Sequence, residues 1–222
     1  MTTLAMPRPR RDSGMEGMVA KWYAANTAEM MNQYVELAQR IAGELATGSS
    51  VLEVAPGPGY FSIELAKRGN YSITGLDLSH TFVEMAAKRA AQAGVNVRFV
   101  QGSASNMPLQ ANSFDFLLCR AAFKNFGQPV VALREMCRVL KPGGRALIID
   151  LRGDASHGEI HREVNAMGLT TVNRILTQLA FRFFLLRRAY TKQQFEQMLA
   201  QAPFSKTHVA ELGLGLEISM TK

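Results

Sequence analysis

The hydrophobic positions of the chain follow two different periods, which alternate along its length. From Met31 to Leu45, apolar residues recur at the spacing of an amphipathic helix. Beyond it, short apolar runs typical of strands alternate with segments of helical spacing. The predicted strands are 51–55, 72–78, 97–101, 114–119 and 145–151, and the predicted helices between them are 60–68, 79–93 and 129–140. This alternation favours right-handed βαβ units and a parallel sheet with helices on both faces.

The pattern changes after the fifth predicted strand. A second helical region is expected at about 158–188, and its later part carries a single apolar stripe. Thr191 and Gln194 then form a capping-box pattern that opens a helix at 192–201. Two final strands are predicted at 206–212 and 216–221, joined by a hairpin turn at Gly213-Leu214-Gly215. The sequence therefore predicts an α/β fold with a doubly wound, seven-stranded, mostly parallel sheet and a helical insertion after the fifth strand.

The domain organisation follows from the same pattern. Residues 1–19 contain prolines and arginines without periodicity, and we interpret them as a flexible basic arm. Residues 20–222 form one domain, in which 152–190 is the helical insertion. Because this insertion leaves the sheet at the carboxyl end of a strand, we interpret it as a lid over the site. One alternative is a cover helix that packs its apolar stripe on the domain and leaves its arginines in water. Another is contact of 181–188 with a membrane surface, since arginines there flank an apolar run.

Composition restricts the classes of protein that fit. The chain has 222 residues, of which 47% are hydrophobic and 19% charged, so a sizeable core is expected and intrinsic disorder is excluded. No apolar run is long enough to span a membrane, and no hydrophobic stretch follows the basic N-terminus as in a signal peptide. The two cysteines lie outside any CxxC motif, which argues against a disulfide framework. We expect a reduced, cytoplasmic, globular protein.

The net charge of +7 is concentrated in two segments. Arg8, Arg10 and Arg11 lie in the N-terminal arm, and residues 164–195 contain basic side chains but no Asp or Glu. Such a surplus fits an anionic substrate, an anionic membrane surface or nucleic acid, and by itself it does not separate them.

The ends of the first two predicted strands carry residues suited to a nucleoside. Gly57 and Gly59 follow the first strand, where the absence of a side chain lets a ligand approach the backbone. Asp77 ends the second strand, and a carboxylate there can accept hydrogen bonds from both ribose hydroxyls. Capping of the following helix is the alternative role for Asp77. Because ligands of doubly wound sheets bind at the carboxyl ends of strands, we expect a nucleoside site.

Two classes of cofactor share this geometry. A dinucleotide needs backbone N–H donors for its pyrophosphate, and Pro56 and Pro58 supply none. The third glycine of the dinucleotide fingerprint is replaced by Ser62, and no Tyr-x-x-x-Lys pair occurs. S-adenosyl-L-methionine contains no phosphate and is therefore favoured, with an NAD(P)-dependent oxidoreductase as the alternative.

A series of motifs then resembles one family. In order along the chain they are Glu53 to Gly59, Gly75 to Ser79, Gly102 to Pro108, Phe114 to Phe116 and Leu140 to Gly144. Together they resemble the class I S-adenosylmethionine-dependent methyltransferases, and most of all the small-molecule group that includes the ubiquinone and menaquinone C-methyltransferases. The resemblance implies the Rossmann-like methyltransferase fold and direct SN2 methyl transfer to a small, apolar or aromatic acceptor. A non-catalytic regulator that binds S-adenosylmethionine is a further alternative.

The resemblance also implies roles for individual residues. The expected cofactor-binding residues are Tyr23, Glu53, Ala55, Gly57, Gly59, Asp77, Leu78, Ser103, Ala104 and Arg120. Ala55 stands where the family usually has glycine, so its backbone is expected to keep a negative φ. Ser103 replaces a frequent aspartate, which leaves a neutral acceptor at the edge of the adenine.

The acceptor side has fewer signals. Besides Arg120, the candidate catalytic residues are Lys124, Asn125, His157 and His161, with Phe123 and Phe126 as pocket walls. No metal is expected, because Gly158 stands where the zinc-protease pattern has a glutamate after its first histidine. No specific nucleic-acid contact is expected either, because the Asn/Asp-Pro-Pro-aromatic motif of base methylases is missing after the fourth strand.

Overall fold

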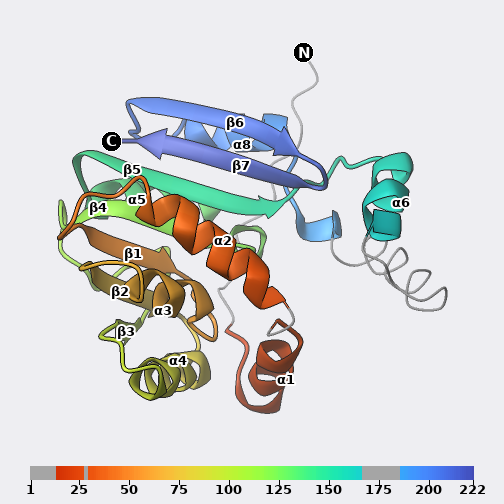
Figure 1. The fold of residues 1–222 in the computed structure, drawn as a ribbon. Helices are drawn as coiled ribbons and strands as arrows, with labels where there is room; N and C mark the ends of the chain where they lie inside the picture. The colour runs from red at the N-terminus through yellow and green to blue at the C-terminus, as the bar shows by residue number, and fades with distance from the viewer. Residues whose placement is uncertain (1–13, 28–29, 167–185) are drawn as a thin grey trace.

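One sheet organises the molecule (Figure 1). The computed structural model describes residues 14–27, 30–166 and 186–222. The strands are β1 (Ser50–Val54), β2 (Ser72–Asp77), β3 (Arg98–Gln101), β4 (Phe114–Arg120), β5 (Leu140–Leu151), β6 (Lys206–Leu212) and β7 (Gly215–Thr221). They form a 7-stranded sheet in the order β3-β2-β1-β4-β5-β7-β6, in which β7 runs antiparallel to its neighbours β5 and β6 and all other neighbouring strands pair in parallel. The predicted doubly wound α/β architecture is confirmed.

Helices cover both faces of this sheet (Figure 1). The α-helices are α1 (Gly17–Thr27), α2 (Met31–Ala42), α3 (Tyr60–Ala66), α4 (His80–Gln92), α5 (Pro129–Val139), α6 (His157–Ala166) and α8 (Lys192–Leu199). Short 3-10 helices occur at η2 (Phe123–Asn125) and η4 (Leu186–Arg188). Buried hydrophobic residues form two clusters on opposite faces of the sheet. One cluster contains residues of α2 and α3, and the other contains residues of α5 and α8.

The central strands are apolar because they are buried on both faces. Val51 packs into the cluster of α2 and α3, whereas Leu52, the next residue, packs into the cluster of α5 and α8. Phe116 and Leu117 divide between the same two clusters in β4. Alternation of side chains across a strand thus explains why these runs are continuously hydrophobic. Because β1 is parallel to its neighbours β2 and β4, the carboxyl ends of these three strands lie on the same side of the sheet.

The fifth strand is longer than predicted. It begins at Leu140 rather than 145, so Pro142, Gly143 and Gly144 lie inside it. Gly143 adopts a φ of 76°, which glycine accepts without strain, and its N–H donates to the carbonyl of Lys222. The register between β4 and β5 shifts at this point. The strand pairs with β4 at Leu140 and again from Arg145, so the glycines interrupt the ladder without ending the strand.

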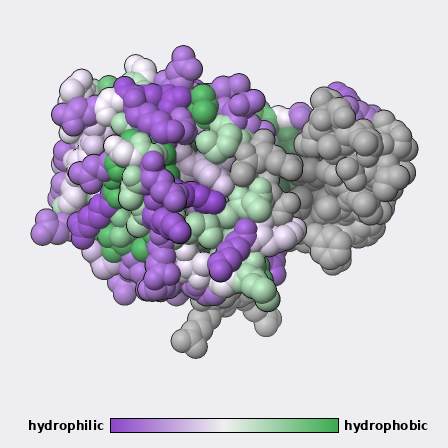
Figure 2. Space-filling model, turned by 60° about the horizontal axis from the view of Figure 1, so that its bottom comes forward, coloured by the Kyte–Doolittle hydropathy of each residue, from purple (hydrophilic) through white to green (hydrophobic). Residues whose placement is uncertain are grey.

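Helix α1 begins at Gly17, inside the segment 1–19 expected to be a flexible arm. Residues 1–13 lie outside the described part. Ala20 and Ala24 are buried, and these small side chains let the helix approach closely. Its outer face exposes Met18, Val19 and Trp22. Elsewhere on the face of the molecule shown in Figure 2, hydrophilic residues predominate and hydrophobic ones appear in patches between them.

The predicted insertion is described in part. Helix α6 and η4 lie within 152–190, and residues 167–185, which include most of the expected 181–188 surface, lie outside the described residues. The lid and the membrane contact therefore stay predictions. In the part of the chain that the structure describes, no helix has the length and apolar character to cross a membrane.

Candidate functional site

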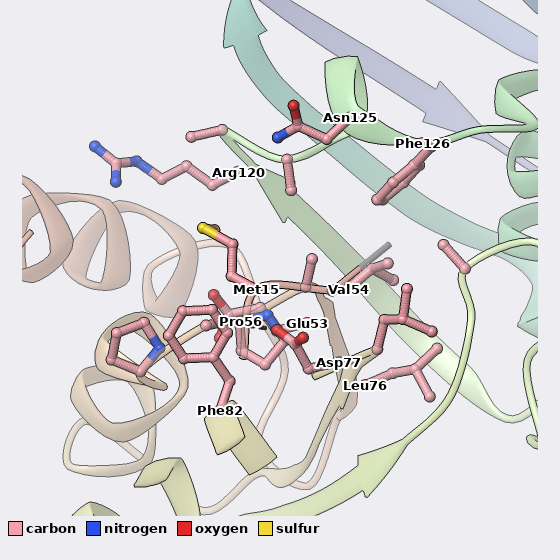
Figure 3. Close-up of a pocket in the computed structure, with 18 of the residues that line it drawn as sticks. Met15, Glu53, Val54, Pro56, Leu76, Asp77, Phe82, Arg120, Asn125 and Phe126 are labelled. Carbon is pink, nitrogen blue, oxygen red and sulfur yellow. Dashed lines mark hydrogen bonds between the residues drawn. The ribbon is translucent and has the colours of Figure 1, made fainter. Parts of the chain in front are cut away.

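A pocket of about 610 Å³ opens at the carboxyl ends of β1, β2 and β4 (Figure 3). This volume suits a ligand of nucleoside size together with a small second molecule. Its lining comes from the strand ends, from α1, α2 and α4, and from the loops after β3 and β4. The lining residues are Gly14, Met15, Tyr23, Tyr34, Glu53, Val54, Ala55, Pro56, Gly57, Pro58, Leu76, Asp77, Leu78, Phe82, Gly102, Ala104, Arg120, Ala121, Ala122, Lys124, Asn125, Phe126 and Arg188.

Most of the expected cofactor residues lie on this pocket. The structure brings together Tyr23, Glu53, Ala55, Gly57, Asp77, Leu78, Ala104 and Arg120. Gly59 and Ser103 are not among the lining residues. Gly59 begins α3 with a φ of 80°, and a β-carbon there would stand 2.9 Å from that of Ala86, so this glycine serves close packing of the helices. The Ser103 hydroxyl accepts a hydrogen bond from the N–H of Ser105 at 3.1 Å.

Asp77 holds the loop after β1 to the end of β2. Its carboxylate accepts hydrogen bonds from the N–H of Gly57 and the N–H of Ser79, both at 2.9 Å. Burial raises its pKa, although these N–H donors oppose the shift. The cap of α4 is the hydroxyl of Ser79, which accepts from the N–H of Phe82, so the capping role considered for Asp77 is wrong. Asp77 is instead a buried acceptor at the pocket wall.

The loop after β1 uses its own backbone donors. The N–H of Ala55 donates to the carbonyl of Leu76, that of Gly57 to Asp77, and that of Gly59 to the carbonyl of Pro56. Pro56 and Pro58 have no N–H. The five residues from Ala55 to Gly59 therefore leave no backbone N–H without an internal acceptor.

Glu53 is buried beneath the same loop. Its Oε2 accepts the N–H of Ser62 at 3.1 Å and the Ser62 hydroxyl at 2.5 Å. Burial raises the pKa of Glu53 to about 7 even though the bonds from Ser62 act in the other direction. Ser62, noticed in the sequence only as a departure from a glycine fingerprint, is thus the partner of a buried carboxyl group.

The backbone at Ala55 corrects a prediction. Its φ is 57°, in the left-handed region, and the expectation of a negative φ is wrong. The chain turns sharply at this residue, between the hydrogen bond from its N–H to the carbonyl of Leu76 and the start of α3. Ala121, at the end of the adjacent strand β4, has a φ of 58° and donates to Ile149 in the same way. Alanine tolerates this conformation at a cost of about 1–2 kcal/mol.

We expect Ala55→Gly to raise the free energy of unfolding by about 0.5–1 kcal/mol, because glycine has no left-handed strain and its greater unfolded entropy offsets only part of that gain. Denaturant unfolding measures the change. The matched control is Ala87→Gly, an exposed position inside α4, which is expected to lose about 1 kcal/mol. If Ala55→Gly lowered the free energy of unfolding as much as Ala87→Gly, the interpretation that Ala55 is strained would be contradicted.

Aromatic rings form another part of the wall. Tyr23 of α1 packs edge-on against Phe82 of α4, with ring centroids 5.9 Å apart. The guanidinium of Arg120 lies 4.4 Å from the centre of the Tyr34 ring and donates to Gln33 at 2.7 Å. Tyr34 and Phe82 were missed because each falls on the apolar stripe of a predicted helix, where a core residue is the simpler interpretation.

The acceptor-side candidates separate into two groups. Lys124, Asn125 and Phe126 line the pocket, and Figure 3 shows the side chains of Asn125 and Phe126 on the side of Arg120. Lys124 forms an ion pair with Asp150 at 2.6 Å, and its backbone N–H donates to the same carboxylate. The Lys124 side chain is therefore held against Asp150.

Three other candidates lie elsewhere. Phe123 is completely buried, 5.0 Å from Phe195 between ring centroids, and its expected place on the pocket wall is wrong. His157 and His161 belong to α6 and are not among the residues that line the pocket. The His161 ring instead contacts the side-chain amide of Asn165 at 2.9 Å. Within residues 14–27, 30–166 and 186–222, no cluster of His, Cys, Asp or Glu is arranged to hold a metal.

Comparison with known proteins agrees with this geometry. Residues 52–148 match the family model described as a methyltransferase domain. A demethylmenaquinone methyltransferase of Deinococcus radiodurans is 37% identical over 107 residues, which cover 48% of this chain and 44% of that protein. The chain thus aligns with less than half of this relative's length.

Solved structures share the fold over most of the chain. A putative S-adenosylmethionine-dependent methyltransferase from Methanococcus maripaludis superposes with a TM-score of 0.76 at 23% identity, covering 98% of this chain and 97% of that one. The [4+2]-cyclase SpnF superposes with a TM-score of 0.65 at 19% identity, covering 85% of this chain and 80% of that one. Residues 52–148 are thus similar to a methyltransferase domain, and the chain shares its fold with a solved S-adenosylmethionine-dependent methyltransferase.

Proposed function

We propose that the pocket binds S-adenosylmethionine and that the chain transfers its methyl group to a small apolar or aromatic molecule. The observation that carries the cofactor assignment is the loop from Ala55 to Gly59, whose backbone donors are all used internally. A pyrophosphate would find no N–H there and would face the carboxyl groups of Glu53 and Asp77. A cofactor without phosphate and with cationic groups fits both features.

The residues of the pocket suit the separate parts of this cofactor. The Asp77 carboxylate is the acceptor for ribose hydroxyls, since each oxygen bonded to an N–H keeps further acceptor capacity. Glu53 lies where an ionised carboxylate can attract the methionine ammonium group. Leu78, Gly102 and Ala104 supply an apolar surface for the adenine.

When bound, S-adenosylmethionine supplies a methyl group on a positively charged sulfur, which needs no further activation. The chain then has to exclude water and align the acceptor. Among the lining residues that the cofactor does not use, Lys124 is ion-paired, and burial raises the pKa of Tyr34 to about 12. We infer an acceptor whose nucleophilic atom loses its proton easily or has none to lose.

The acceptor class is argued from the apolar part of the lining. Val54, Leu76, Phe82 and Phe126 present aliphatic and aromatic surface to the pocket. The name of the Deinococcus radiodurans relative indicates a quinone-type ring as its substrate, and a ring of that kind fits such a surface. An aromatic hydroquinone is therefore the first acceptor to test.

Binding and turnover test the proposal separately. Equilibrium dialysis is expected to show binding of S-adenosylmethionine and no comparable binding of NADH or NADPH. Incubation with a series of hydroquinones and naphthols is expected to yield S-adenosylhomocysteine, detected by chromatography. Dinucleotide binding in place of S-adenosylmethionine would favour the oxidoreductase alternative. Binding without methyl transfer would favour a regulator or another reaction on this fold, as the name of the cyclase SpnF illustrates.

A further inference from the structure

A short strap, residues 14–16, connects the pocket to the start of α4. Gly14 and Met15 line the pocket, and in Figure 3 the Met15 side chain lies between Arg120 and Phe82. A β-carbon on residue 14 would stand 3.2 Å from the backbone nitrogen of Ser79, so the strap runs closely along the turn between β2 and α4. This turn follows Asp77 directly.

Glu16 fastens the strap to α4. Its carboxylate accepts the N–H of His80 at 3.0 Å, the N–H of Thr81 at 3.1 Å and the Thr81 hydroxyl at 2.6 Å. The same hydroxyl accepts the N–H of Gly17 at 3.1 Å. A negative charge at the start of a helix is favoured by the helix dipole, and hydrogen bonds to Thr81 lower the pKa of Glu16 so that it stays ionised.

These contacts are more than an ordinary helix cap. The cap of α4 is already the Ser79 hydroxyl, which bonds to Phe82. Glu16 lies 64 residues before His80 and 65 before Thr81 in the chain. Its hydrogen bonds to these residues therefore attach a distant segment to the start of α4. Beyond the strap, α1 is held by the edge-on contact of Tyr23 with Phe82 and by the Tyr60 hydroxyl, which donates to the carbonyl of Ala24 at 2.9 Å.

We propose that Glu16 is a positioning residue that fastens the strap across the nucleoside end of the pocket and thereby slows the release of the bound cofactor. The inference rests on the proposed binding of S-adenosylmethionine. The strap and Tyr23 form the wall next to Asp77, so a ligand held by Asp77 is enclosed on that side only while the carboxylate bonds to Thr81 and His80 are intact.

The experiment measures dissociation rates of S-adenosylhomocysteine from the full chain by stopped-flow fluorescence. Trp22, the one tryptophan of the sequence, lies on α1 and reports on this helix. Glu16→Ala is expected to raise the dissociation rate of S-adenosylhomocysteine about three- to tenfold. This is the size of effect that follows from removing charge-assisted hydrogen bonds at a solvent-exposed position. Thr81→Val, which keeps the backbone donor and removes the hydroxyl, is expected to raise it in the same direction.

The double variant and a control make the result specific. Because both side chains act through one set of bonds, Glu16→Ala with Thr81→Val is expected to release the ligand little faster than Glu16→Ala alone. Glu84→Ala, an exposed position on the same helix that pairs with His80, is expected to leave the rate unchanged. Unchanged dissociation in Glu16→Ala, or equal acceleration in Glu84→Ala, would overturn the role of Glu16. If the wild-type chain itself binds no S-adenosylhomocysteine, the proposed function fails instead.

Discussion

Replacing Asp77 with alanine is expected to weaken the binding of S-adenosylmethionine ten- to a hundredfold. Two effects add in this position. The ribose loses its charged acceptor, and the N–H groups of Gly57 and Ser79 lose the carboxylate that joins the β1 loop to the end of β2. Hydrogen bonds to a charged group are worth about 1.5–3 kcal/mol, which corresponds to this range of affinity. Isothermal titration calorimetry measures the dissociation constant.

Two further variants test whether the loss is specific to the Asp77 carboxylate. Asp77→Asn keeps the shape of the side chain but turns an N–H₂ group toward one of the two backbone N–H donors. We therefore expect this variant to bind S-adenosylmethionine about as weakly as Asp77→Ala does. Asp115→Ala removes a carboxylate that likewise joins strands, through Ser50 and Lys141, but that lies at the beginning of β4 and away from the pocket. It is expected to leave the affinity unchanged. An Asp77→Ala variant with wild-type affinity would remove the ribose assignment.

The architecture follows from signals that are local in the sequence. Buried strands are continuous apolar runs, amphipathic helices carry one stripe, and turns are marked by glycine and proline, so element order and sheet type could be predicted. The start of β5 could not, because Gly143 looks like a turn residue until its partner is known. That partner is Lys222, at the other end of the chain, whose carbonyl accepts the Gly143 N–H.

Some residues of the candidate site could likewise be predicted from the sequence, and others could not. Positions that follow strand ends, such as Glu53, Asp77 and Arg120, are brought to the pocket by topology, which the sequence reveals. Tyr34 and Phe82 reach it from helices, and their rotation about the helix axis depends on packing that no local pattern records. The left-handed backbone of Ala55 was missed for a related reason, since it depends on the direction in which the chain leaves β1, which no residue pattern records.

The buried carboxyl group of Glu53 makes the stability of the chain depend on pH. Its pKa is about 7 in the folded state and 4.5 in its ordinary state, so between these values the folded chain holds a proton that the unfolded chain has lost. The stabilisation is therefore complete below pH 4.5 and is lost as the pH rises through 7. The difference amounts to about 3 kcal/mol.

Glu53→Gln is accordingly expected to match the wild type near pH 4.5 and to be more stable by up to about 3 kcal/mol at pH 8. The glutamine oxygen still accepts both bonds from Ser62, so the native contacts remain. Denaturant unfolding at several pH values measures the difference. The control, Glu64→Gln, removes a neighbouring carboxylate whose pKa is lowered by Lys67 and Arg68, and it is expected to lose stability at neutral pH.

The same ionisation links stability to binding. A cationic ammonium group next to Glu53 favours the charged carboxylate, so at pH 6 the wild type has to release a proton on binding, whereas at pH 8 it does not. We expect the affinity for S-adenosylmethionine to rise between these pH values in the wild type and to stay flat and weaker in Glu53→Gln. Calorimetry in buffers of different ionisation enthalpy counts the protons. A variant that gained stability and kept both the affinity and the pH dependence would show that Glu53 faces no cation, because the cost of burying this carboxylate is recovered only when a positive charge comes to lie beside it.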